Sequence, residues 1–464
     1  MSDPRQSCKG HLNNLKTWRN HVRVRRLCRN FVLPNNKLRE FMNRMTSCID
    51  EGLGKETHPK ATIKCWQTYV QDMPTGNEKG QFLALDLGGS NFRVLKLDLG
   101  ENQYFKMSQE TYECSKELMN GTGTILFDYI ANCLNNFVTA QGIKTNSQLP
   151  LGFTFSFPMS QSSINSGELV RWTKGFTCDG VVNQDVVQLL TKSIKNIPDL
   201  NIHICSILND TVGTLMSCAW LNPKTRIGLI VGTGCNCCYV EKVKNIQLYS
   251  GDQTKEEMVI NLEWGAYGDN NELEDFHTKY DKVVDENSEN RGQQIFEKMI
   301  SGMYLGELLR LVLLDMIDKE LIFDGTKPSM LNTPQSLTSD VLSLIENDPP
   351  GTYPGTRKFL QKIGVANPTD GDCMNVRYAT ECISRRSAYL VAAGLSAILN
   401  KMNEKDVIIG VDGSVYKYHP FYHNLLMDKI SELVNSGIKF GILLSEDGSG
   451  RGAAVLASAV CPDG

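Results

Sequence analysis

The feature that most constrains the fold of this chain is an apolar strand that enters a glycine-rich turn and returns as a second strand. Residues 82–88 read FLALDLG and residues 92–99 read FRVLKLDL, with GSN between them. The same pattern recurs in IGLIVGTG at 227–234, which returns as CCYVEKV at 237–243. Apolar runs on either side of a Gly/Asn turn predict β-hairpins. Because the pattern occurs twice, it predicts two related halves that face each other.

Helical patterns fill most of the remaining chain. A third strand, residues 407–411, ends at Asp412-Gly413-Ser414. Apolar residues at helical spacing predict helices over residues 34–52, 125–140, 186–195, 292–320, 382–401, 423–435 and 450–460. Strands that alternate with helices indicate an α/β architecture. The Pro-rich stretch 324–375 is predicted to be a surface excursion with one short helix at 338–347.

Length and charge exclude several classes of protein. A chain of 464 residues is too long for one core, so two domains are expected. With 48 basic and 52 acidic residues, the chain has no global positive field to hold nucleic acid. Its longest apolar runs, such as residues 311–314, are too short to span a membrane. Fifteen scattered cysteines in a large chain predict reduced thiols and a cytoplasmic location.

The first 30 residues contain eight basic residues and one acidic residue. This composition predicts a solvated helix with four apolar side chains turned inward. They are Val22, Val24, Leu27 and Phe31. A mitochondrial transit peptide, which is also Arg-rich and poor in acidic residues, is the alternative.

Both glycine turns have the composition of a phosphate-binding loop. Exposed backbone N–H groups in a glycine turn form a cradle for anions. Asp86 ends the first strand, where it is placed to hold magnesium directly or through water. A plain hairpin turn is the alternative, since Gly and Asn are favoured there too. The second turn, residues 232–236, favours phosphate binding, and the absence of Walker A and GxGxxG motifs indicates an unusual nucleotide-binding scheme.

Polar and acidic side chains follow several apolar segments. Asp210 comes directly after the apolar run 202–208, where it is placed to act as a general base. A helix N-cap is an equally good interpretation of Asp210 from local sequence. Glu263 and Glu297, taken alone, are typical of surface acids. Combined, seven residues form a set of donors and acceptors suited to sugar hydroxyls: Thr173, Lys174, Asn209, Asp210, Asn236, Glu263 and Glu297.

Two other candidate sites are disfavoured. Cys235, Cys237 and Cys238 have C-x-C-C spacing and lack a second cysteine or histidine pair, which predicts structural thiols rather than a metal site. Ser156 lies in FSFP and not in G-x-S-x-G, so a hydrolase nucleophile is not expected.

Nine segments, in the same order, resemble the eukaryotic hexokinase/glucokinase family over about residues 30–460. They are LDLGGSNFRVL (85–95), LGFTFSFP (151–158), WTKGF (172–176), ILNDTVGTL (207–215), IGLIVGTGCNCCYVE (227–241), NLEWGAYGD (261–269), FEKMISGMYLGEL (296–308), GVDGSVYK (410–417) and SEDGSGRGAA (445–454). The resemblance implies a single catalytic unit with the two-domain sugar-kinase/actin-like ATPase superfold and a cleft between the domains. It implies a large domain of residues 1–62 and 209–445. The small domain would be residues 63–208, joined by a C-terminal helix over 446–464.

The resemblance also implies a function and a set of site residues. The expected reaction is transfer of the γ-phosphoryl group of MgATP to the 6-hydroxyl of glucose, the first step of glycolysis, with mannose and fructose as further substrates. Asp210 would be the base, and Lys174 would keep Asp210 ionised and offset charge at the transferred group. The implied sugar contacts are Ser156, Thr173, Lys174, Asn209, Asp210, Asn236, Glu263 and Glu297. The implied nucleotide contacts are Asp86 (also the magnesium residue, through water), Gly88, Gly89, Ser90, Asn91, Arg93, Gly232, Thr233, Gly234, Gly302, Ser339, Ser343, Gly413 and Ser414.

The product is a further expected ligand. Ser90, Thr233 and Ser445 lie where vertebrate relatives hold the phosphate of glucose 6-phosphate, so the resemblance alone allows product inhibition and leaves open whether it occurs. The sequence departs from the family around Ser339 and Ser343, and Ser90 replaces a more frequent Thr. A non-catalytic sugar sensor and an actin-like or chaperone-like ATPase remain the rival functions. The intact catalytic positions disfavour the first, and the sugar set disfavours the second.

Overall fold

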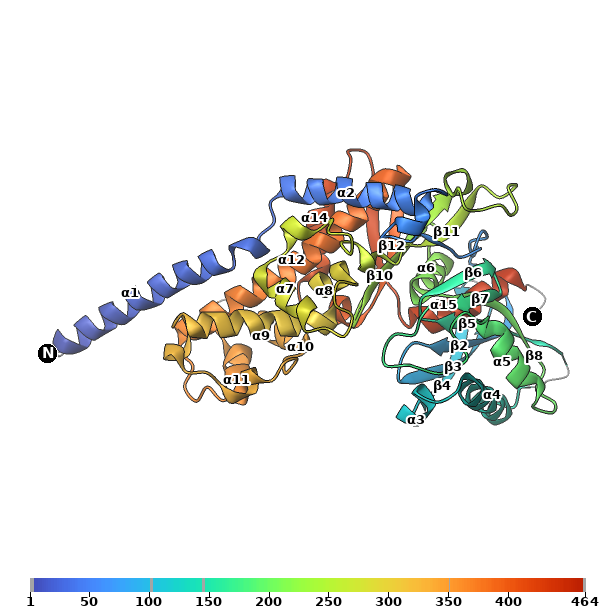
Figure 1. Cartoon of the computed structure of the whole chain (residues 1–464), viewed down its shortest axis with the longest axis horizontal. Helices are drawn as coiled ribbons and strands as arrows, with labels where there is room; N and C mark the ends of the chain where they lie inside the picture. Colours follow the sequence, from blue (N-terminus) through green and yellow to red (C-terminus); the bar gives the residue numbers. More distant parts are fainter. Residues whose placement is uncertain (1–3, 101–102, 144–146, 350, 462–464) are drawn as a thin grey trace.

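Two β-sheets organise the chain, each with its own set of helices (Figure 1). The computed structural model describes residues 4–100, 103–143, 147–349 and 351–461, with side chains from residue 15 onward. One sheet has five strands in the order β4-β3-β2-β5-β8, and the other has six in the order β1-β11-β10-β9-β12-β13. The predicted α/β class and its division around two glycine hairpins are confirmed.

The five-stranded sheet is built around the first hairpin. Its strands are β2 (Gly80–Leu87), β3 (Asn91–Leu99), β4 (Phe105–Glu113), β5 (Leu149–Phe155) and β8 (Ile202–Leu208). Alternate residues of β2 enter different cores, because successive side chains of a strand point to opposite faces. Leu83 and Leu85 pack with helices α4 (Gly123–Ala140) and α5 (Val186–Lys195), whereas Phe82 and Ala84 belong to a core on the other face.

The six-stranded sheet is built around the second hairpin. Its strands are β1 (Trp66–Gln67), β9 (Thr225–Val231), β10 (Cys235–Lys242), β11 (Glu257–Asn261), β12 (Asp406–Asp412) and β13 (Lys439–Leu444). The helices that carry its main core are α2 (Asn35–Leu53), α7 (Lys279–Glu286), α8 (Ile295–Ile300), α9 (Gly302–Asp318), α12 (Asp370–Met402) and α14 (Tyr422–Leu433). The smaller elements are β6 (Met159–Ser163), β7 (Ser166–Leu169), α3 (Lys116–Met119), α10 (Asp340–Glu346), α11 (Pro354–Ile363) and α13 (Ser414–Tyr418).

Two helices, α6 (Asp210–Leu221) and α15 (Gly448–Val460), pack together between the sheets. Their shared core contains Phe82 of the five-stranded sheet and Val240 of the six-stranded sheet. The helix backbones approach so closely that a Cβ at Gly452 would lie 1.8 Å from the carbonyl oxygen of Gly213. Helix α15 therefore packs against the five-stranded sheet, although the strands of that sheet lie more than 200 residues earlier in the sequence.

The structure corrects several predicted helix bounds. The predicted helix 292–320 is two helices, because Ser301 is extended, with ψ of 155°. The helix predicted from residue 382 begins at Asp370, where Thr369 and Asp372 form a capping box. The excursion 324–375 contains an unpredicted helix, α11, which has proline at its start and Gly364 in the left-handed conformation at its end.

The N-terminal segment forms helix α1 (Pro4–Leu27), which projects from the body of the molecule (Figure 1). Val24 and Phe31 are buried and Leu27 is partly buried, as predicted. The prediction for Val22 is wrong, since its side chain is 39% exposed. Val22 lies two residues before the buried Val24, which is about 200° around the helix axis. Its side chain therefore points away from the side that Val24 buries. None of the helices in the described ranges is long and apolar enough to cross a bilayer.

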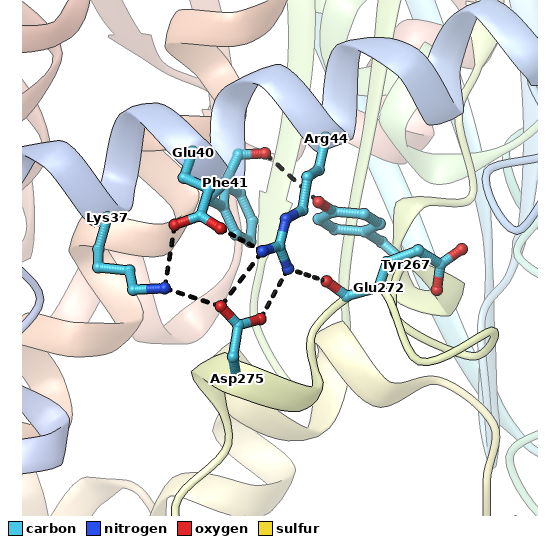
Figure 2. A network of polar contacts seen from close by, with 7 residues as sticks. All are labelled: Lys37, Glu40, Phe41, Arg44, Tyr267, Glu272 and Asp275. Carbon is cyan, nitrogen blue, oxygen red and sulfur yellow. Dashed lines mark hydrogen bonds and ion pairs between the residues drawn. The ribbon is translucent and has the colours of Figure 1, made fainter.

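A polar network ties helix α2 to the segment that follows strand β11 (Figure 2). Arg44 donates to the Asp275 carboxylate at 2.6 Å, and Lys37 donates to it at 2.8 Å. The hydrogen bond from Arg44 holds the pKa of Asp275 down at about 2. The Tyr267 hydroxyl donates to the carbonyl of Phe41 at 3.3 Å. These contacts anchor the segment 267–275, which begins four residues after Glu263, against the large core.

Candidate active site

The first glycine turn carries an ionic cluster at its base. Asp86 and Arg93 are paired across strands β2 and β3, and Arg93 contacts the Asp86 carboxylate at 2.5 Å. Arg93 also contacts Asp447 at 2.5 Å, and the Ser449 hydroxyl donates to Asp86 at 2.7 Å. The start of helix α15 is thus joined to the predicted phosphate turn. Sequence reasoning missed Asp447 and Ser449, although both lie in the quoted segment SEDGSGRGAA.

The turn itself is open. Ser90 and Asn91 are exposed, and a Cβ at Gly89 would meet no atom within 4 Å. Gly88 lies beside Ser156, since a Cβ at Gly88 would be 3.7 Å from the Ser156 hydroxyl. The backbone of residues 88–90 is therefore available to an anionic ligand, next to a predicted sugar contact.

The second turn is closed on one side by helix α9. The amide of Gly302 donates to the carbonyl of Gly232 at 2.8 Å, and the amide of Met303 donates to that of Thr233 at 3.1 Å. A Cβ at Gly302 would lie 2.8 Å from the Gly232 oxygen. Gly413 has φ of +114°, and a Cβ there would lie 2.4 Å from the Val231 carbonyl. Glycine is required at both positions by the close backbone approach.

Beside this turn lies a cavity of about 180 Å³. Ser339, Ser343 and Ser414 line it, together with Leu305, Leu342 and His419. Ser339 also lies next to Gly302, since a Cβ at Gly302 would be 3.2 Å from the Ser339 hydroxyl. The structure therefore brings five of the residues predicted for the adenosine side, Gly302, Ser339, Ser343, Gly413 and Ser414, to the turn at residues 232–234.

Asp210 is the first residue of helix α6, directly after strand β8. The N-cap is Asn209, whose side chain accepts from the amide of Thr211 at 3.0 Å. The N-cap interpretation of Asp210 is therefore wrong by one residue. Burial raises the pKa of Asp210, while the charge of Lys174 lowers it and those of Asp86 and Asp412 raise it. Lys174 was expected to keep Asp210 ionised. Burial, which favours the protonated form, has the larger effect on the pKa.

Amide and carboxylate groups converge beside Asp210. The side-chain amide of Asn236 donates to Asn261 at 2.9 Å and to Glu263 at 3.0 Å, and that of Asn261 donates to Glu263 at 2.8 Å. Glu263 has φ of +52°, a strained conformation for a residue with a side chain. Asn261 was not among the predicted residues, although it opens the quoted segment NLEWGAYGD.

Glu297 completes the group from helix α8. Its carboxylate accepts from the amide of Cys235 at 3.0 Å. Burial raises its pKa to about 7, and the charges of Glu263 and Asp210 add to the increase. Burial also raises the pKa of Glu263. Three carboxyl groups within electrostatic range of one another thus belong to this site.

Lys174 provides the positive charge that these carboxyl groups share. Its ammonium group donates to the carbonyl of Ser156 at 2.8 Å and lies 5.5 Å from the centroid of the Phe157 ring. Its charge lowers the pKa of Asp210, Glu263 and Glu297. Thr173 precedes it and is half-buried. Ser156, Thr173 and Lys174 therefore approach the site from the five-stranded sheet.

Other predicted residues lie apart from this group. Ser445 is fully buried and its hydroxyl bonds that of Ser217 at 3.2 Å, whereas Ser90 and Thr233 are exposed. The structure therefore does not present the Ser445 hydroxyl to solvent, as it does the other two. Cys235 and Cys237 enter the large core and Cys238 enters the core between the sheets, so these thiols do not converge. That they bind no metal stays a prediction.

Comparison with known proteins gives consistent matches over nearly the whole chain. Two sequence models described as hexokinase match residues 23–220 and 226–459. The chain is 42% identical to hexokinase-1 of Homo sapiens over 444 residues, covering 94% of this chain and 48% of that protein. It is 45% identical to hexokinase-2 of Homo sapiens over 433 residues, covering 91% of this chain and 46% of the relative. The chain thus spans about half the length of these curated relatives.

Solved structures match at the level of the whole fold. A hexokinase from Schistosoma mansoni complexed with glucose has a TM-score of 0.88 and 40% identity, covering 96% of this chain and 100% of that one. A second hexokinase crystal structure has a TM-score of 0.83 and 29% identity, covering 95% and 99% of the two chains.

Proposed function

The chain belongs to the hexokinase family, and we propose that it transfers the γ-phosphoryl group of ATP to the 6-hydroxyl of glucose. The observation that carries this proposal is the position of Asp210. It begins helix α6 within electrostatic range of Lys174, of the phosphate-turn residue Asp86, and of Glu263 and Glu297. A carboxylate between a polar set and a phosphate turn is suited to activate a hydroxyl toward a phosphoryl group.

In this proposal the polar set binds and orients the sugar. Amides and carboxylates offer both donors and acceptors to hydroxyl groups. The side chains that would contact glucose are Ser156, Thr173, Lys174, Asn209, Asp210, Asn236, Glu263 and Glu297. We add Asn261 as a positioning residue, because its amide bonds the Glu263 carboxylate and its carbonyl accepts from Asn236.

Asp210 takes the proton from the 6-hydroxyl as the sugar oxygen attacks the γ-phosphorus. The new O–P bond forms while the bond to the β-phosphate oxygen breaks, and ADP leaves. Phosphoryl transfer depends mainly on positioning and charge stabilisation. The backbone of residues 88–91 and 232–234 would cradle the phosphates, and Lys174 would offset charge on the transferred group. A raised pKa brings Asp210 closer to the operating pH, where general bases are most effective.

The residues around Asp86 fit a magnesium ion. The contacts from Arg93 and Ser449 both fall on Oδ2 of Asp86, which leaves Oδ1 as the hard oxygen donor that magnesium prefers. Bound with ATP, magnesium supplies charge neutralisation to the phosphates. The adenosine would be held by Gly302, Ser339, Ser343, Gly413 and Ser414, which border or line the cavity beside the second turn.

The finer features of the function are proposed on the resemblance. They are use of mannose and fructose, a cytoplasmic location, and inhibition by glucose 6-phosphate bound through Ser90, Thr233 and Ser445. The burial of Ser445 means that its hydroxyl would have to leave Ser217 to meet a phosphate.

The test measures ADP and glucose 6-phosphate from purified protein with MgATP, with and without glucose. We expect both products in equal amounts and only when glucose is present. ADP without glucose would identify the actin-like or chaperone-like ATPase, and no ADP under either condition would identify a sugar sensor. Repeating the assay with mannose, fructose and added glucose 6-phosphate measures the finer features separately.

A further inference from the structure

Three potential metal ligands meet at the edge of the five-stranded sheet, away from the proposed active site. The donor atoms of His203, Cys205 and Cys461 all lie within 4.8 Å of one another. Across the described ranges, no other three His, Cys, Asp or Glu side chains were found in a comparable arrangement. The proposed function makes no use of these residues.

The fold explains why these residues meet. His203 and Cys205 are two residues apart on strand β8, so they share one face of the sheet. Helix α15 packs on that face and ends at Val460, which places Cys461 directly after the helix. Strand β8 is the edge strand of its sheet. The imidazole of His203 is exposed there and has no hydrogen-bond partner among the described residues, which leaves its nitrogens available to a ligand from solvent.

The donor set has the chemistry of a zinc ligand set. Two thiolate sulfurs and one imidazole nitrogen are preferred ligands of Zn²⁺, at about 2.3 and 2.0–2.1 Å from the ion. Tetrahedral bonding at those lengths separates the donors by about 3.5–3.8 Å. The donor atoms lie within 4.8 Å of one another, so each pair has to approach by at most about 1.3 Å to reach this geometry. Three protein ligands would leave the fourth position to water.

We propose that His203, Cys205 and Cys461 bind one zinc ion, which fastens the end of helix α15 to strand β8. Helix α15 has 13 residues, so the site lies about 20 Å along the helix from the contacts of its first turn with Asp86. The ion therefore lies apart from the groups of phosphoryl transfer.

The test uses the whole chain, reduced and freed of metal with a chelator, and titrated with Co²⁺ and then Zn²⁺. We expect one equivalent of Co²⁺ to give the near-ultraviolet thiolate-to-cobalt absorption and the intense visible bands of tetrahedral cobalt, and Zn²⁺ to abolish both. Cys461→Ser and His203→Gln change partly or fully exposed side chains, so these variants should fold. Each should weaken zinc binding at least about tenfold, because loss of even a residue that only orients a metal ligand costs about 10–100-fold.

Two further variants make the test specific. Cys205→Ser should lose the cobalt spectrum, and Cys382→Ser should keep it. Cys382 is the matched control, because it belongs to another hydrogen-bonded thiol pair, with Cys28, that includes no histidine. Zinc should also raise the Tm of the parent protein and not that of Cys461→Ser.

Several results would overturn the proposal. One is no binding of either metal at micromolar concentration by the reduced protein. A second such result is metal binding that the variants of His203, Cys205 and Cys461 all retain. The metal would then be bound at another site, for example at Cys235–Cys238. A disulfide between Cys205 and Cys461 in protein kept free of added oxidant, with no metal bound after reduction, would identify a redox pair instead. Lost glucose phosphorylation with retained zinc binding would count against the proposed function alone.

Discussion

At the residue scale, the side chain on which the proposed chemistry depends most is Asp210. Asp210→Asn keeps the shape of the side chain and removes its basicity. Because Asn209 caps helix α6, the substitution leaves the cap intact. We expect kcat to fall by at least about 10²-fold with little change in ATP affinity, and no loss of stability at neutral pH, because the amide removes a charge that burial disfavours. Steady-state kinetics measure kcat and the KM for ATP, and thermal denaturation measures stability. The control is Asp318→Asn, which changes an exposed aspartate at the end of helix α9 and should keep the parent's turnover. Parent-like turnover of Asp210→Asn would contradict the assignment of Asp210 as the base.

Glu297 gives a second residue-scale prediction, on stability. Its pKa is raised to about 7 from an ordinary value of 4.5, so the folded protein favours the protonated form. The stability that this carboxyl contributes is fully present below pH 4.5 and is lost as the pH rises through about 7. Glu297→Gln mimics the protonated form. Without sugar, we therefore expect the variant to be more stable than the parent at pH 8, by about 1–3 kcal/mol, and close to it at pH 5.

Urea denaturation of the sugar-free proteins at the two pH values checks this prediction. Glu289→Gln, at an exposed position, is the control and should give the same small difference at both pH values. An equal difference between Glu297→Gln and the parent at pH 5 and pH 8 would show that Glu297 has no raised pKa. The variant should also bind glucose more weakly, since it loses a charged acceptor.

At the scale of elements, the contact between helix α9 and the second glycine turn is the feature that the structure adds to the sequence. A Cβ at Gly302 would lie 2.8 Å from both the Gly232 oxygen and a methyl group of Val415. Gly302→Ala therefore has to push the start of helix α9 away from the turn. We expect a loss of about 1–3 kcal/mol of stability and a several-fold increase in the KM for ATP, with a smaller change in the KM for glucose.

Thermal denaturation and kinetics with each substrate varied separately check Gly302→Ala. For stability, Gly89→Ala is the matched control, because its added Cβ meets no atom within 4 Å and should leave the Tm unchanged. A Gly302→Ala variant as stable as the parent, with the same KM for ATP, would argue against a tight contact between helix and turn.

At the scale of the whole molecule, strand β1 pairs with β11 of the six-stranded sheet, and Ile63 and Cys65 enter the large core, so residues 63–67 belong with the large part. Apart from these residues, we propose the division into a small domain of residues 63–208 with 446–464 and a large domain of 1–62 with 209–445. The packing of helix α15 on the five-stranded sheet supports it. The proposed sugar contacts come from both parts, so glucose should favour a closed arrangement that excludes water. We expect small-angle scattering to give a smaller radius of gyration with glucose, and no change with sorbitol at the same concentration. The same radius with and without glucose would contradict closure.

Local sequence determined the elements that carry the site. The two hairpins and the strand before Asp210 follow from apolar spacing and turn residues, whereas helix α6 was not predicted beyond an N-cap placed one residue late. The sequence also contained signals that were passed over, such as Thr369 and Asp372 at the start of helix α12 and the proline and glycine that bound helix α11. Each of these elements depends on residues that lie only a few positions away in the sequence. A single sequence, with no alignment, is therefore sufficient to predict them.

Tertiary structure decided what the elements do together. It placed Asp447 and Ser449 beside Asp86, joined Asn261 to Glu263, buried Ser445, and brought Cys461 to His203 and Cys205. It also set the direction in which the pKa values of Asp210 and Glu297 move. Hydrogen bonding, the meeting of potential ligand side chains and desolvation depend on distances between segments up to several hundred residues apart. Packing of the two sheets around α6 and α15 fixes those distances, and no local spacing in the sequence encodes them.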